Sequence, residues 1–156
     1  MADKSVTLEM PDGRRTFTDL VLDYTGTLAY SGELIAGVDE RLKHLATLLH
    51  VTVMTADTFG TAAAQLQGLP VEKVLIKNGQ EKAAAVKQLG GDNVIAIGNG
   101  RNDVPMMSVA GLSIAVIGPE GAAGELVRVA DVVMRDICEA LDLITHPLRL
   151  KATLRD

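Results

Sequence analysis

The stretch that decides the fold runs Leu20-Val21-Leu22-Asp23-Tyr24-Thr25-Gly26-Thr27. Three apolar, strand-forming residues lead into an aspartate, and a small turn that contains a glycine follows. Because open α/β sheets bind ligands at the carboxyl ends of their strands, this pattern predicts that Asp23 lies in a ligand-binding crevice. An aspartate in such a place has three ordinary uses, as a metal ligand, as a covalent nucleophile or as the cap of a turn.

The rest of the chain repeats the pattern of buried strands. Segments rich in apolar residues recur at 51–54, 72–76, 94–97 and 112–117, and continuous apolar runs are typical of parallel strands that are buried on both faces. Apolar residues with helical spacing fill the gaps between the runs, namely Val38, Leu42, Leu45 and Leu49, then Val86 and Leu89, then Ile137, Leu141 and Ile144. This alternation predicts an α/β protein with a doubly wound, Rossmann-like parallel sheet.

The composition fits one globular domain over residues 1–156. The chain is 47% hydrophobic and long enough to bury a core without disulfide bonds. Its net charge of −5 argues against non-specific binding to nucleic acid, and its single cysteine excludes an internal disulfide or a cysteine-based zinc site. The first residues lack the apolar core of a signal peptide, and no apolar run approaches the ~18 residues of a membrane span. We therefore expect a cytoplasmic protein with no nucleic-acid or membrane partner.

A β-hairpin is predicted over residues 5–18, ahead of the main sheet over 19–144. Two strand-like segments, 5–9 and 14–18, flank the turn signal Pro11-Asp12-Gly13. Its exposed edge makes it a candidate contact for homo-oligomerisation. Neither 24–54 nor 56–81 is long enough for a nucleotide-binding domain or a sizeable cap, once the predicted helices and strands are placed there.

Polar residues follow the predicted strands at the ends where ligands bind. Thr55 follows the run 51–54, and the segment Gly98-Asn99-Gly100-Arg101-Asn102-Asp103 follows the run 94–97. Lys82 lies in the first turn of the helix that begins at Gly79. If these strands are neighbours of the first, all these side chains converge with Asp23 on one crevice.

This set contains the parts that phosphoryl transfer through a carboxylate requires. Asp23 fits the nucleophile and Lys82 the fixed positive charge beside it. Thr55 offers its hydroxyl to a phosphate oxygen, and the backbone N–H groups that follow it, beginning with that of Ala56, offer further donors.

A Mg²⁺ ion would also find oxygen ligands in this set. They are a carboxylate oxygen of Asp23, the backbone carbonyl of Thr25, and an oxygen of either Asn99 or Asp103, with water completing an octahedron.

Each of these residues also has a purely structural interpretation. Asp23 fits the cap of a turn, and Asp103 fits the start of a helix, where a carboxylate is stabilised by the helix dipole. Thr55 fits the N-cap of a helix that begins at Thr58. Lys82 fits an exposed helix face, and other lysines nearby compete for its place in the crevice.

The motifs in this order resemble the four motifs of the haloacid dehalogenase (HAD) superfamily, and the resemblance spans about residues 19–144. They are most similar to the phosphorylation domain of P-type ATPases. The resemblance implies a capless Rossmann-like core with strand order 3-2-1-4-5, an aspartyl-phosphate intermediate and dependence on Mg²⁺. With that order, the loop Gly118-Pro119-Glu120-Gly121 lies near the crevice. The residues implied are Asp23, Thr25 and Lys82 for catalysis; Thr55, Ala56, Gly26 and Asn102 for substrate binding; and Asp23, Thr25, Asn99 and Asp103 for the metal.

Two residues depart from the pattern of typical HAD phosphatases. Thr25 replaces a second aspartate that acts as general acid and base, a role worth roughly 10²–10⁴-fold in rate. That loss corresponds to about 3–5 kcal/mol of barrier lowering. Asn99 stands where the ATPase signature has an aspartate, so the metal site has one negative charge fewer. The pair predicts a slow or specialised enzyme.

Three functions compete for this sequence. The first is a Mg²⁺-dependent phosphatase that acts through Asp23 on a small phosphorylated metabolite or a phosphoprotein. The second is a non-catalytic phosphate-binding or regulatory interaction module that retains the fold. The third, a response-regulator receiver, is disfavoured because receivers place an acidic pair after the first strand and the phosphate acceptor after the third.

Overall fold

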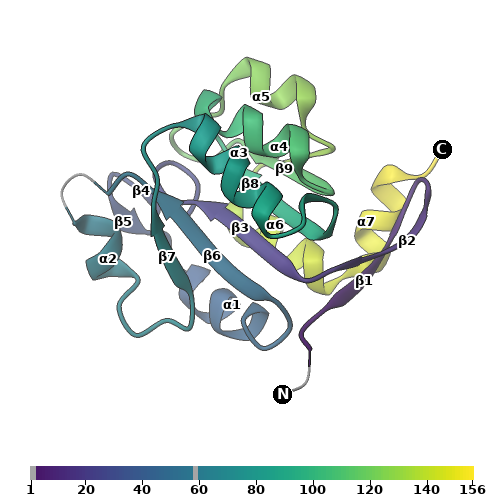
Figure 1. Ribbon diagram of the computed structural model, residues 1–156, viewed down its shortest axis with the longest axis horizontal. Helices are drawn as coiled ribbons and strands as arrows, with labels where there is room; N and C mark the ends of the chain where they lie inside the picture. Colours follow the sequence, from purple (N-terminus) through teal and green to yellow (C-terminus); the bar gives the residue numbers. More distant parts are fainter. Residues whose placement is uncertain (1–2, 58–59) are drawn as a thin grey trace.

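The computed structural model describes residues 3–57 and 60–156, and its centre is a six-stranded parallel sheet with helices on both faces (Figure 1). The strand order is β7-β6-β3-β8-β9-β10. The bounds are β3 Asp19–Asp23, β6 His50–Thr55, β7 Glu72–Leu75, β8 Val94–Gly98, β9 Leu112–Val116 and β10 Val132–Met134. The predicted fold and the order 3-2-1-4-5 are confirmed. The sixth strand, β10, was not predicted.

The strand β3 lies at the centre of the sheet, and all five of its residues are buried. Successive side chains of a strand point to opposite faces of the sheet. Leu20 and Leu22 accordingly belong to one apolar cluster, and Val21 belongs to a second cluster on the other face. The end of β3 therefore places Asp23 at the carboxyl end of the sheet, between two packed layers.

Two groups of helices cover these faces. Helices α1 (Val38–Leu45) and α6 (Ile137–Thr145) contribute to the first cluster. Helices α3 (Gly79–Gln88), α4 (Val104–Val109) and α5 (Gly124–Val129) contribute to the second. The predicted stripes on α1 and α6 are confirmed. Two details were wrong, since Leu49 is buried but lies beyond the end of α1, and Leu89 follows α3 and is 36% exposed.

Only short elements connect the strands near the crevice. Between β3 and β6 lie α1 and a small hairpin of β4 (Ala29–Tyr30) and β5 (Glu33–Leu34), which we call the flap. Between β6 and β7 lies α2 (Thr61–Gln65). The turns of 3₁₀ helix are η1 (Gly91–Asn93) and η2 (Arg101–Asp103). The described segments between the strands therefore hold no sizeable cap, as predicted.

The two ends of the chain pack together beside the sheet. The predicted hairpin consists of β1 (Val6–Met10) and β2 (Gly13–Phe17), and α7 (Pro147–Leu154) lies along β1 (Figure 1, purple and yellow). Leu8 and Leu150 are buried there, and Lys151 forms a 2.8 Å ion pair with Glu9. Helix α7 was not predicted, and the role of the hairpin in homo-oligomerisation stays a prediction. None of the described helices is long and apolar enough to span a membrane.

Candidate active site

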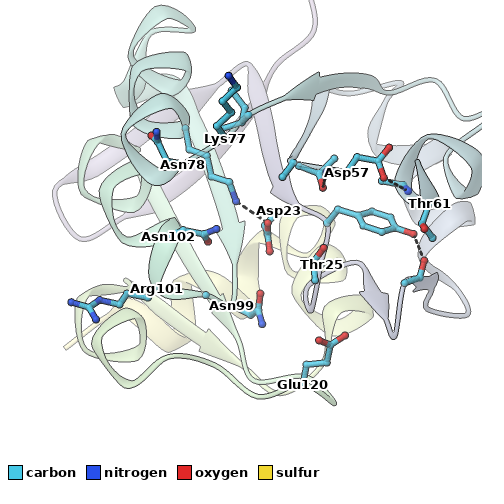
Figure 2. A pocket seen from close by; sticks show the side chains of 18 residues that line it. Asp23, Thr25, Asp57, Thr61, Lys77, Asn78, Asn99, Arg101, Asn102 and Glu120 are labelled. Carbon is cyan, nitrogen blue, oxygen red and sulfur yellow. Dashed lines mark hydrogen bonds and ion pairs between the residues drawn. The ribbon is translucent and has the colours of Figure 1, made fainter. Parts of the chain in front are cut away.

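A crevice of about 740 Å³ opens at the carboxyl ends of the central strands (Figure 2). The residues proposed from the sequence gather there, because β3, β6 and β8 are neighbours as expected. Those that line the crevice are Asp23, Thr25, Thr55, Ala56, Lys82, Asn99 and Asn102. Asp103 lies directly behind this wall, whereas Gly26 is not among the lining residues.

Lys82 is held between two carboxylates. Its Nζ donates to Oδ1 of Asp23 at 2.8 Å and to Oδ1 of Asp103 at 2.7 Å. Only 3% of Lys82 is exposed, so the alternative of an exposed helix face is wrong. Burial lowers the pKa of this ammonium group, but the two carboxylates outweigh burial and the net pKa is raised. Lys82 therefore stays positively charged in the site.

Asp23 is a buried carboxylate with one oxygen on Lys82 and the other on a hydroxyl. Burial and the nearby charge of Asp103 raise its pKa to about 6, against the opposing effect of Lys82. Its Oδ2 accepts a hydrogen bond from Oγ1 of Thr27 at 3.1 Å. The backbone N–H groups of residues 27–29 instead donate to the carbonyl of Tyr24. Asp23 therefore does not cap its turn, and its carboxylate faces the crevice.

Asp103 positions Lys82 and closes the loop that carries Asn99. It is fully buried; Oδ1 accepts from Lys82, and Oδ2 accepts from the backbone N–H groups of Asn99 and Gly100. A side chain on Gly98 would collide with this carboxylate, which explains the glycine there. Because both oxygens of Asp103 already accept hydrogen bonds away from solvent, the geometry favours Asn99 as the direct metal ligand of the two.

Asn99 connects three segments of the site. Its Oδ1 accepts from Oγ1 of Thr27 at 3.1 Å, and its Nδ2 donates to the carbonyl of Gly121 at 3.1 Å. Gly26 has a φ of 77°, and a Cβ there would collide with the amide of Asn99. The close contact with Asn99 thus requires a glycine at position 26. The predicted role of Gly26 in substrate binding stays a prediction. Sequence reasoning gave Thr27 no role, although its hydroxyl links Asp23 to Asn99.

The oxygen atoms of Asp23, Asn99 and Thr25 are suitable ligands for Mg²⁺. Oδ2 of Asp23 and Oδ1 of Asn99 both lie 3.1 Å from the Thr27 hydroxyl, and Thr25 lines the crevice beside them. Among the described residues no group of three or more His, Cys, Asp or Glu side chains gathers as a metal cluster. A cation here would rely on one carboxylate, neutral oxygens and water. Mg²⁺ accepts such a set, since it is commonly bound by one or two carboxylates and keeps several waters.

Thr55 does not cap the following helix. Its Oγ1 accepts from the backbone N–H of Asp57 at 3.2 Å. The carboxylate of Asp57 accepts from the N–H groups of Ala62 and Ala63 at the start of α2. That helix begins at Thr61 with Gly60 as its N-cap residue. The N-cap interpretation of Thr55 is therefore wrong, and Thr58 lies outside the described residues. Thr55 thus borders the crevice with its hydroxyl and the backbone after it.

The outer walls of the crevice carry further charged side chains. Lys77 and Arg101 lie on one side with Asn102, whose amide points toward Asp23 (Figure 2). Glu120 lies across the crevice from them, near Thr25 (Figure 2). Glu120 was expected near the crevice only as part of its loop. The two walls thus differ in charge.

Comparisons with known proteins identify the family of this chain. A family model described as haloacid dehalogenase-like hydrolase matches residues 64–139. An uncharacterized protein of Methanocaldococcus jannaschii is 46% identical over 87 residues, which make up 51% of this chain and 94% of that relative. The chain belongs to the haloacid dehalogenase superfamily of hydrolases.

Solved structures share its fold. A 3-deoxy-D-manno-octulosonate 8-phosphate phosphatase from Moraxella catarrhalis, in complex with magnesium, phosphate and its sugar acid, superposes with a TM-score of 0.69 at 16% identity, over 88% of this chain and 92% of that one. The cobalt-bound deoxy-D-mannose-octulosonate 8-phosphate phosphatase of Haemophilus influenzae gives 0.70 at 17% identity, over 84% and 88%. A phosphoserine phosphatase in its apo form gives 0.67 at 15%, over 82% and 99%. At these identities the likeness is one of fold.

Proposed function

We propose that this protein is a Mg²⁺-dependent phosphatase that acts through an aspartyl-phosphate at Asp23. One observation carries the proposal: the Nζ of the buried Lys82 lies 2.8 Å from the buried carboxylate of Asp23 at the floor of a crevice. That arrangement supplies a nucleophile and the charge that offsets its repulsion by a phosphate. Phosphatases among the proteins of similar fold support the same class of reaction.

The first step forms a bond between an oxygen of Asp23 and phosphorus and breaks the bond between phosphorus and the leaving oxygen. Lys82 offsets the negative charge that the carboxylate and the phosphate bring together. The hydroxyl of Thr55, the N–H of Ala56 and the amide of Asn102 are donors for the remaining phosphate oxygens. The leaving alkoxide takes its proton from water, because Thr25 offers no carboxyl group for that purpose.

The second step returns Asp23 to its starting state. A water molecule attacks phosphorus, the bond between phosphorus and Asp23 breaks, and inorganic phosphate leaves. Thr25 cannot act as a strong general base for that water, so this step is expected to be slow. Asp23, Asn99 and Thr25 would hold Mg²⁺, which when bound neutralises charge on the phosphate oxygens.

The test is turnover of a panel of phosphate monoesters with Mg²⁺ by wild-type protein, Asp23→Asn and Asp19→Asn. Asp19 is a matched control, since it is a buried aspartate at the other end of the same strand. We expect Asp23→Asn to lose at least about 1,000-fold in rate, whereas Asp19→Asn keeps the wild-type rate. Turnover by Asp23→Asn near the wild-type rate would end the proposal.

A non-catalytic phosphate-binding module is the second candidate. It is favoured by the neutral Asn99 in the metal site and by Thr25 in place of an acid. Beryllium fluoride with Mg²⁺, a mimic of a phosphorylated aspartate, separates the two. If it raises the melting temperature of the wild type but not of Asp23→Asn, while no ester is turned over, the binding module is correct. If it has no effect on the wild type, neither function holds.

A further inference from the structure

The crevice is bridged on one side by a contact between two distant segments. The backbone N–H of Ser31, at the tip of the flap, donates to Oε2 of Glu120 at 3.0 Å. Ser31 adopts a left-handed backbone conformation with φ of 51°, as the tight turn of the flap requires. Glu120 and the neighbouring Gly32 both line the crevice. The bridge is therefore part of the crevice wall.

Both ends of this bridge are anchored by residues that line the crevice. On the flap side, the buried Tyr24, which follows Asp23 directly, donates its hydroxyl to the carbonyl of Gly32 at 2.7 Å. On the loop side, Gly121 donates to Gly118 at 2.9 Å and accepts from Nδ2 of Asn99 at 3.1 Å. An aspartate in place of Asn99 has no N–H to donate, so the amide holds the loop of Glu120 as well as facing the metal site.

The charge of Glu120 has no close partner within the described parts of the chain. No lysine, arginine or histidine there comes within ion-pair distance of it. The opposite wall carries Lys77 and also Arg101, which is paired with Glu125 at 3.4 Å. One carboxylate oxygen is used by Ser31, so the other is available to a bound molecule. A leaving group with its own negative charge is repelled if that charge lies on the Glu120 side.

The size of the crevice points to the class of substrate. Its volume of about 740 Å³ falls in the range of small-molecule sites, roughly 300–1,000 Å³. Asp23 is only 7% exposed at its floor, so a phosphate group must enter the crevice, between its lining residues, to reach this carboxylate.

We propose that Glu120 is a specificity-determining residue that restricts this site to small phosphorylated molecules. Its hydrogen bond to Ser31 holds the crevice closed on that side against a peptide backbone, and its charge disfavours anionic groups along the same wall. The inference rests on the proposed phosphatase activity and names the substrate class of that site.

Two variants separate the bridge from the charge. Glu120→Gln keeps an acceptor for Ser31 and removes the charge, whereas Glu120→Ala removes both. Glu72→Gln is the control for a lost surface charge, since Glu72 lies at the start of β7, at the amino-terminal end of the sheet.

The size selection is tested with a blocked phosphoserine amide and a neutral nine-residue phosphoserine peptide. Wild type should favour the small ester in kcat/KM. Glu120→Ala should shrink that preference at least about tenfold, with the change mainly in KM for the peptide, while Glu120→Gln keeps it. Wild-type preference for the peptide, or an unchanged preference in Glu120→Ala, would overturn the inference.

The charge selection is tested with glycerol 3-phosphate and 3-phosphoglycerate, which differ by one carboxylate. Glu120→Gln should raise relative kcat/KM for the carboxylate-bearing ester about two- to five-fold, the size expected of an exposed charge interaction. Glu72→Gln should leave the ratio unchanged. An unchanged ratio in Glu120→Gln would remove the charge part of the proposal.

Hydrogen exchange of the flap amides tests the bridge without any turnover. Exchange over residues 29–34 should be faster in Glu120→Ala than in wild type or Glu120→Gln. Equal exchange in all three would show that the bridge does not restrain the flap and would overturn the inference. If instead the wild type turns over no ester, the proposed phosphatase fails, and the exchange result still decides whether Glu120 holds the flap.

Discussion

Asp103 accepts a 2.7 Å hydrogen bond from Nζ of Lys82 at a position with no exposure to solvent. Asp103, the second carboxylate of the site, therefore positions Lys82. The two carboxylates raise the pKa of Lys82 against the effect of burial, whereas burial and the nearby charge of Asp103 raise the pKa of Asp23 against the effect of Lys82.

The roles of Asn99 and Asp103 can be separated by Mg²⁺ binding. Asn99→Ala removes an oxygen that faces the proposed metal site, so we expect at least about a tenfold loss of Mg²⁺ affinity. Asp103→Asn should lose less affinity and more kcat, because it releases Lys82. Calorimetric titration with Mg²⁺ and steady-state kinetics measure the two quantities. A larger affinity loss in Asp103→Asn would identify Asp103 as the direct ligand.

Replacement of Lys82 should destabilise the fold strongly. Lys82→Met leaves two buried carboxylates without a cation, which typically costs about 3–5 kcal/mol in the free energy of unfolding. Lys87→Met, at an exposed position of the same helix, should cost almost nothing. Urea unfolding at pH 8 measures both. The loss for Lys82→Met should be smaller at pH 5, where a carboxyl can be protonated, and an equal loss at both pH values would contradict this explanation.

The raised pKa of Asp23 predicts how stability depends on pH. The folded state holds this proton up to a pKa of about 6, against 3.8 as the ordinary value, so the folded state binds more protons between these values. The stabilising contribution is complete below the ordinary pKa and is lost as pH rises through about 6. At pH 8 the cost reaches about 3 kcal/mol, from 1.36 kcal/mol per pKa unit.

Asp23→Asn removes this titration and serves as the comparison. In EDTA, its unfolding free energy should exceed that of the wild type by an amount that grows from pH 4 to pH 8. A difference in unfolding free energy between the two proteins that stays constant, or that shrinks with rising pH, would contradict the raised pKa of Asp23. Unfolding in urea over that pH range is the measurement.

Helix α7 is expected to be part of the folded domain. Leu150 is buried against the amino-terminal hairpin, so Leu150→Ala should cost about 2–5 kcal/mol in the free energy of unfolding. Leu148 on the same helix is 77% exposed, and Leu148→Ala should change little. If both variants unfold like the wild type, α7 does not pack on the hairpin in solution.

Much of this structure could be predicted from the sequence, because the signals are local. The apolar runs 51–54 and 94–97 mark buried strands, and the polar residues directly after them had to lie at one end of the sheet. The short strand β10 has only three residues and its middle one is exposed, so its apolar run is too short to mark a buried strand by itself. Leu89 was wrongly assigned to the buried face of α3. An apolar residue that continues the spacing of a helix can lie beyond the end of that helix.

The remaining features depend on contacts that no local pattern encodes. The choice between Asn99 and Asp103 turns on the direction of each side chain, and Gly98 and Lys82 determine that of Asp103. The contact between Ser31 and Glu120 joins residues 89 positions apart in the chain. The motif contained Thr27, but only the three-dimensional arrangement gives its hydroxyl two acceptors.

The most direct test of the nucleophile is to trap the phosphorylated enzyme. Wild-type protein with Mg²⁺ and a small phosphate monoester is quenched in acid during turnover, digested and analysed by mass spectrometry. We predict one phosphate on the peptide that contains Asp23, and none in Asp23→Asn. Sustained turnover by wild-type protein with phosphate on another residue, or with unmodified Asp23 throughout, would contradict the account.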